Sequence, residues 1–163
     1  MLLMIVLMLS STKIVASASF DQGYEPEAIV CTPGLVSYTE NGRTLMKQVN
    51  QTGNSHNSSS VTQTSINSVM RTAFASITVG GNAELSLIVS KIGFYTEVSA
   101  GVSVNLSDTI TVNVPPYSTV YWEYGSNLVK TTGSLKYIND DCSYTNKTVT
   151  AEYTYDRYYR WWQ

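Results

Sequence analysis

The sequence is poor in charged residues. Asp, Glu, Lys and Arg make up 13% of its 163 residues, against about a quarter in ordinary globular domains. The formal net charge is −2, so the chain lacks the basic excess that a nucleic-acid partner normally requires. It also offers no strong electrostatic attraction to anionic lipid. The composition therefore predicts no nucleic-acid partner.

Residues that commonly carry catalysis are also scarce. The single histidine, His56, lies in a polar segment with no apolar neighbour to hold its imidazole in place, as general-base catalysis requires. The chain contains no G-x-S-x-G, H-E-x-x-H or P-loop motif. Glu84 and Glu97 could form a glycosidase pair and residues 139–141 a calcium site, but solvated strand positions and an ordinary turn explain them better. We therefore predict a protein that is not an enzyme, with no catalytic residues, no metal site and no cofactor.

The sequence has no apolar run of membrane length. The run from Leu2 to Leu9 is too short to span a bilayer, which takes about 20 residues. It is followed by Ala16-Ser17-Ala18, and this order predicts a secretory signal peptide over residues 1–18. No Lys or Arg precedes the run, and a buried N-terminal strand or helix is the alternative. Residues 19–163 are then expected to form a single secreted, extracellular domain.

Cysteine is limited to two residues, Cys31 and Cys142. In an oxidising compartment an even number of cysteines predicts a disulfide, and two separate buried thiols are the alternative. Two cysteines without a nearby histidine make a zinc site improbable.

Short polar residues and tyrosine take the places of the missing charges and phenylalanine. The chain has 12 Tyr against 3 Phe, and Tyr, Ser and Thr suit strands with one wet face. Apolar and polar residues alternate with a period of two in four stretches: Val98–Leu106, Ile110–Val114, Val120–Tyr124 and Val149–Tyr155. Turn signals, such as Gly125-Ser126-Asn127, separate them. The pattern predicts an all-β fold, either an antiparallel β-sandwich or an elongated antiparallel sheet.

Two further segments need interpretation. Residues 50–60 read NQTGNSHNSSS, without an apolar residue, which predicts a flexible polar loop. Residues 83–94 are apolar on two faces, so a doubly covered strand and a short buried helix are both allowed. The glycines at 80, 81 and 93 bracket this segment like a strand with bends, and we therefore favour a strand.

Aromatic residues crowd the last part of the chain, with Arg157 and Arg160 between them. Such rings can stack on sugars, insert at a membrane interface or bind a partner, because each combines a flat apolar face with a polar edge. Alternatively they fill the core and cover a sheet edge. The candidate binding surface comprises Tyr153, Tyr155, Tyr158, Tyr159, Trp161 and Trp162.

One segment carries a resemblance to known proteins. Residues 108–141, DTITVNVPPYSTVYWEYGSNLVKTTGSLKYINDD, resemble small secreted proteins of Gram-positive bacteria in their alternating strands, V-P-P-Y break and late cysteine. The element Val114-Pro115-Pro116 after Ser/Thr-rich strands is also similar to the aerolysin-type β-pore-forming toxins, of the epsilon-toxin and mosquitocidal-toxin kind. This second resemblance implies that Val98–Leu106 is a candidate membrane-inserting strand.

These observations predict a secreted, non-enzymatic protein that acts by binding or assembly. Its partner is expected to be an extracellular ligand, a cell-envelope component or a second copy of the chain. The alternative is a membrane-active protein of the β-pore-forming toxin type, for which contact with a membrane is the distinguishing property.

Overall fold

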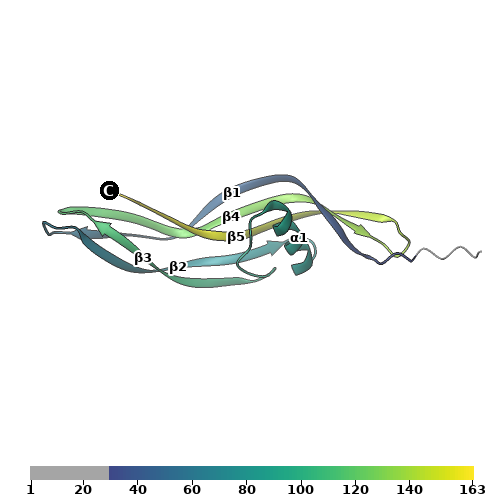
Figure 1. The fold of residues 1–163 in the computed structure, drawn as a ribbon, viewed down its shortest axis with the longest axis horizontal. Helices are drawn as coiled ribbons and strands as arrows, with labels where there is room; N and C mark the ends of the chain where they lie inside the picture. Colours follow the sequence, from purple (N-terminus) through teal and green to yellow (C-terminus); the bar gives the residue numbers. More distant parts are fainter. Residues whose placement is uncertain (1–29) are drawn as a thin grey trace, which may run out of the picture.

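The computed structural model describes residues 30–163, so the predicted signal peptide lies outside the described residues. Strand makes up 68% of the described chain, and the all-β prediction is confirmed. Figure 1 shows an elongated molecule in which the long strands run side by side along its length. The elements are β1 (Gly34–Asn57), β2 (Gln63–Ile77), α1 (Asn82–Ile92), β3 (Ser103–Val114), β4 (Ser118–Ile138) and β5 (Tyr144–Trp162).

The five strands form an antiparallel sheet of order β1-β4-β5-β2-β3. The central strand β4 pairs with β1 and β5 over nearly its whole length. β2 pairs with β3 from Gln63 to Phe74, but it joins β5 only through residues 75–77. The first part of β2 therefore leaves the main sheet together with β3. It covers the face of β4 as a second layer, with a core formed by Val69, Ile110, Val112, Val114, Val120, Trp122 and Tyr124.

The helix α1 covers the same sheet beyond this second layer (Figure 1). Its buried residues, Leu85, Ile88, Val89 and Ile92, follow the helical spacing of three or four residues. They pack with residues of β4 and β5 in a second core. The helix begins after Gly81, whose amide donates to the Glu84 carboxylate, and it ends at Gly93 with a φ of 78°. The prediction of a strand over residues 83–94 is therefore wrong.

Three other local predictions also need correction. Residues 50–57 are not a loop but the end of β1, and the connection to β2 covers only residues 58–62. Exposed polar side chains alternate there with buried ones, so polar composition hides a paired strand. Residues 98–102 precede β3, which begins at Ser103, and Gly125-Ser126-Asn127 lies inside β4 rather than at its end.

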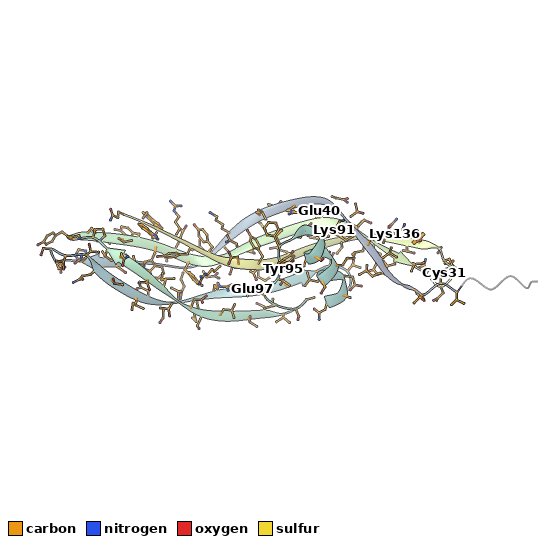
Figure 2. The ribbon with its side chains drawn as sticks, viewed as in Figure 1. Cys31, Glu40, Lys91, Tyr95, Glu97 and Lys136 are labelled. Carbon is orange, nitrogen blue, oxygen red and sulfur yellow. A yellow bond between two sulfur atoms is a disulfide. The ribbon has the colours of Figure 1, made fainter. Side chains whose placement is uncertain are left out.

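The structure joins Cys31 to Cys142, with a Cα–Cα distance of 5.3 Å across 111 residues of sequence, and confirms the predicted pairing. Cys142 lies in the turn between β4 and β5, at the end of the molecule opposite the C-terminus (Figures 1 and 2). The bridge therefore ties the start of the described chain to this distant turn.

Removing this disulfide is expected to destabilise the protein. The double variant Cys31→Ala/Cys142→Ala should lose about 4 kcal/mol of free energy of unfolding, because the bridge closes a long loop in the unfolded chain. Urea denaturation measures the loss. As a control, thiol labelling of the unreduced, unfolded wild-type protein should find no free cysteine, and two labelled thiols per chain would contradict the bridge.

Candidate functional site

The strands β1, β4 and β5 run side by side near the C-terminal end of β5 (Figure 1), and the register places side chains of all three on one face of the sheet there. Directly opposed residues of antiparallel strands point to the same face. Tyr121 on β4 therefore shares a face with Trp162 on β5 and with Asn54 on β1, and Glu123 shares it with Arg160. We call this group the outer aromatic surface; it comprises Asn54, Tyr121, Glu123, Tyr158, Arg160 and Trp162.

Two rings of this surface stack across the strands. The Tyr121 and Trp162 ring centroids lie 6.1 Å apart with an interplanar angle of 20°. Both side chains are open to solvent, with 45% of Tyr121 and 38% of Trp162 exposed. The Arg160 guanidinium lies 5.2 Å from the Trp162 ring centroid, so a cation flanks the stacked pair.

The polar groups of the surface are held by one another. The Tyr158 hydroxyl donates to the Glu123 carboxylate, and the same carboxylate lies 4.0 Å from the Arg160 guanidinium. The hydrogen bond to Glu123 raises the pKa of Tyr158, because it stabilises the neutral phenol as a donor. The Lys47 ammonium lies 4.6 Å above the Tyr158 ring. Glu123 is thus fixed between a neutral donor and a cation.

The six aromatic residues predicted from the C-terminal segment divide into three groups. Tyr153 and Tyr155 belong to the core: Tyr153 is fully buried, and its hydroxyl donates to the Phe94 carbonyl at 2.7 Å. Tyr158 and Trp162 belong to the outer aromatic surface. Tyr159 and Trp161 lie on the opposite face of the sheet, since they pair with Tyr124 and Trp122.

A shallow hollow lies beside Tyr159 on that inner face. Its volume is about 230 Å³, and Tyr124, Arg157 and residues 109–111 of β3 complete its lining. Burial raises the pKa of Tyr159.

Three residues of the outer aromatic surface were not predicted from the sequence: Asn54, Tyr121 and Glu123. Only the strand register brings them beside Trp162.

A second cluster of charges joins the two layers of the sheet. The Arg71 side chain on β2 is almost completely buried, and two of its N–H groups donate to Glu97 at 2.5 and 2.7 Å. Its third donor lies 3.4 Å from Asp108 on β3, which also accepts from the Tyr124 hydroxyl on β4. We call these four residues, Arg71, Glu97, Asp108 and Tyr124, the Arg71 cluster.

The charges of the cluster shift the titration of its members. The hydrogen bond from Tyr124, followed by contact with Arg71, holds the pKa of Asp108 below its usual range. Burial and the same carboxylate raise the pKa of Tyr124 to about 12. The hydrogen bonds to the Glu97 carboxylate raise the pKa of Arg71. At neutral pH, Arg71 and Asp108 are therefore charged and the Tyr124 phenol is neutral.

Glu97 belongs to the segment between α1 and β3, and Figure 2 shows it on the side of the β2–β3 layer. Its bond to Arg71 ties that segment to β2.

The interpretation of Glu84 and Glu97 as solvated strand positions is wrong. Glu84 accepts hydrogen bonds from the Gly81 amide and from the Tyr137 hydroxyl, and Glu97 accepts from Arg71. His56 lies on β1, with its Nδ1 atom 2.9 Å from the Thr119 hydroxyl.

Within residues 30–163, no group of three or more His, Cys, Asp or Glu side chains is arranged to hold a metal ion. The helix of the described chain is not long and apolar enough to cross a membrane.

No protein-family model matches the sequence, and no curated protein sequence is significantly similar to it. Three solved structures share part of the strand arrangement, each over 82% of this chain. They are the lamprey immune protein (TM-score 0.47, 9% identity), the parasporin-2 toxin of Bacillus thuringiensis that recognizes cancer cells (0.37, 16%) and a non-toxic crystal protein from the same bacterium (0.40, 9%). The matched regions cover 53%, 73% and 82% of those chains, so this chain spans about half of the lamprey protein. These likenesses are too distant to indicate a function.

Proposed function

We propose that this chain is a non-enzymatic extracellular protein that binds a cell surface and acts there by assembly rather than by catalysis. The outer aromatic surface carries the proposal. It exposes two stacked rings beside fixed polar groups, and this combination is typical of binding surfaces rather than of a solvated sheet face. The disulfide supports an oxidising compartment.

The experiment for this proposal measures binding and association together. Protein recovered from the medium of expressing cells is added to washed cells, and the bound fraction is then cross-linked and sized on a denaturing gel. We expect saturable binding and cross-linked species larger than one chain on the cells. A chain that binds neither cells nor vesicles made from their lipids would contradict the proposal.

The second candidate is a membrane-active protein of the β-pore-forming type, and the two faces of the β2–β3 pair favour it. One face carries buried apolar side chains such as Val69, Val112 and Val114, together with the buried Arg71 and its partner Asp108. On the other face, Ser, Thr and Asn predominate at opposed positions, for example Ser68 with Thr109. Apart from Asp108, β3 alternates in this way over its 12 residues, and strands that cross a membrane alternate similarly and need about 9–11 residues.

The β2–β3 pair also has a weak connection to the rest of the sheet. Only residues 75–77 of β2 pair with β5, whereas β2 and β3 pair over most of their lengths. The segment between them, residues 78–102, contains α1 and packs on the second core. It adds one short link to β5, in which Thr78 and Thr150 exchange two hydrogen bonds. We infer that the pair would move as one unit, by breaking the short β2–β5 connection, if the protein inserts into a membrane.

Two engineered disulfides separate this motion from a general loss of flexibility. Ser76→Cys/Glu152→Cys staples β2 to β5, and Thr72→Cys/Asn105→Cys staples β2 to β3; both link directly opposed residues, whose Cα spacing suits a disulfide. On dye-loaded vesicles made from lipids of the bound cells, we expect release by the unmodified protein. The β2–β5 staple should abolish release, and the β2–β3 staple should preserve it.

The outcomes distinguish the two candidate functions. Cell binding without dye release would exclude the membrane-active candidate and leave the binding proposal in place. Equal release by both stapled variants would show that the β2–β5 connection does not need to open.

A further inference from the structure

We propose that the outer aromatic surface is a carbohydrate-binding site for the flat face of a neutral pyranose. Trp162 and Tyr121 would stack against the sugar ring, while Glu123, Arg160 and Asn54 would hydrogen-bond its hydroxyl groups. The inference rests on the proposed role in surface binding, and it names the chemistry of the partner.

The rings suit the apolar part of a sugar. A pyranose presents C–H groups on its face and hydroxyls around its rim. The face of an aromatic ring is partly negative and apolar, so it attracts such C–H groups and excludes water from them. Tyr121 and Trp162 are fixed on paired strands and stack with an interplanar angle of 20°. They therefore form an apolar wall that loses little entropy when a ligand binds.

The polar groups suit the rim of the sugar. A carboxylate accepts from hydroxyl groups through two oxygens, a guanidinium donates through a planar set of N–H groups, and an amide does both. Glu123 is held by the Tyr158 hydroxyl beside Arg160, and Asn54 stands opposite Tyr121 on the exposed side of β1. Acceptors and donors therefore lie beside the apolar wall without further rearrangement of the backbone.

The charges favour a neutral ligand. The Arg160 guanidinium lies against the Trp162 ring and 4.0 Å from the Glu123 carboxylate. The cation nearest the rings therefore already has an anionic partner, and a neutral ligand needs no further counter-charge. Lys47 covers the ring of Tyr158, and the exposed Arg160 side chain lies over the ring of Trp162. Tyr121 is therefore the ring of these three without a cation over it, and Arg160 would move aside where a sugar stacks on Trp162. Interfacial Trp and Tyr also anchor proteins in lipid headgroups, but a carboxylate next to the rings disfavours burial there.

Calorimetric titration without lipid tests the inference. The probes are four soluble neutral tetrasaccharides: chitotetraose, cellotetraose, di-N-acetyllactosamine and α-linked mannotetraose. We expect saturable binding of at least one. Trp162→Ala should weaken that binding by about tenfold or more, the equivalent of about 1.4 kcal/mol, and Trp162→Phe should retain most of it. Glu123→Gln and Asn54→Ala should weaken it without loss of the ring wall.

The matched control is Tyr144→Ala. Tyr144 is also an exposed aromatic residue of β5, with the Lys136 ammonium 3.8 Å above its ring, but it lies at the other end of the strand. Its removal should leave sugar binding unchanged. Thermal unfolding of every variant establishes that it is folded, and Asn54→Ala, which changes only an exposed side chain, tests the site if Trp162→Ala does not fold.

Three results would overturn the inference. They are no saturable binding of any of the four probes, an equal loss of binding in Trp162→Ala and Tyr144→Ala, and Trp162-dependent binding to sugar-free phosphatidylcholine vesicles without sugar binding. The third result would make the ring pair a lipid anchor and would leave the proposed surface-binding function standing. That function fails separately, if the wild-type chain binds neither cells nor vesicles made from their lipids.

Discussion

Replacing Arg71 by methionine is expected to lower the free energy of unfolding by about 3 kcal/mol, because it leaves two carboxylates without their buried cation. Methionine keeps much of the volume of the arginine stem, so the loss reports the charge rather than a cavity. Arg71 donates to Glu97 and lies close to Asp108. The variant should also release the segment between α1 and β3 from β2, and urea denaturation measures the change.

The control for this prediction is Arg43→Met. Arg43 also makes a two-pronged ion pair, with Glu40 at 2.7 Å for both bonds, but the two side chains are 33% and 27% exposed against 8% for the Arg71 side chain. Solvent screens such pairs, so this variant should lose less than about 1 kcal/mol. Similar losses of unfolding free energy in Arg71→Met and Arg43→Met would contradict the expectation that the buried ion pair contributes more than the exposed one.

The Arg71 cluster also determines how the stability of the protein is expected to depend on acid pH. Asp108 has a lowered pKa, first because of Tyr124 and then because of Arg71. A carboxyl group of this kind stabilises the fold above its usual pKa of 3.8 and loses that contribution as the pH falls through its lower, folded value. Wild-type stability should therefore fall below about pH 4, and the fall should be shallower in Tyr124→Phe and Arg71→Met.

Some strands of this fold could be predicted from local pattern alone. Ile110–Val114, Val120–Tyr124 and Val149–Tyr155 alternate with a period of two. Each lies in a strand, and the residues of the stripe are buried there except Tyr155, which is half-buried. In each case one face of the strand meets a core, and the other meets solvent except at the buried Thr154 of β5. The period of two then follows from geometry, whatever the topology of the sheet.

Other segments depend on contacts that the local pattern does not contain. Residues 83–94 satisfy both a covered strand and a helix, and the sheet beneath them decides, because it buries Leu85, Ile88, Val89 and Ile92 together. Residues 50–57 look like a loop by composition. They form a strand because β4 pairs with them, while their exposed side chains remain in water.

The residues of the candidate site are also only partly predictable from the local sequence pattern. The crowded rings near the end of the chain indicate Tyr158 and Trp162, but they do not distinguish them from Tyr153, which is buried. Tyr121 and Glu123 are more than thirty residues away in sequence. They join the surface only because the register of β4 and β5 opposes Tyr121 to Trp162. A binding surface built across strands therefore requires the pairing, which single-sequence patterns do not supply.

Gly125→Ala is expected to have the other large effect, with a loss of about 3 kcal/mol or more of free energy of unfolding. A Cβ atom at Gly125 would lie 1.8 Å from the Gln48 carbonyl oxygen and 3.0 Å from the Asn50 amide nitrogen. Both are backbone atoms of β1, which cannot rotate away as a side chain can. The strands would have to separate where the register shifts between Val49 and Gln51.

The close approach at Gly125 explains why a glycine that suggests a turn stands inside a long strand. Gly42→Ala is the matched control, because its Cβ atom would meet only the Thr132 hydroxyl oxygen, at an ordinary 3.6 Å, in the same pair of strands. That variant should change stability by less than about 1 kcal/mol. Gly125 is opposed to Tyr158, so the first variant should also disturb the outer aromatic surface. If Gly125→Ala and Gly42→Ala are equally stable in urea, β1 and β4 can move apart at the register shift and accommodate the added Cβ atom at little cost.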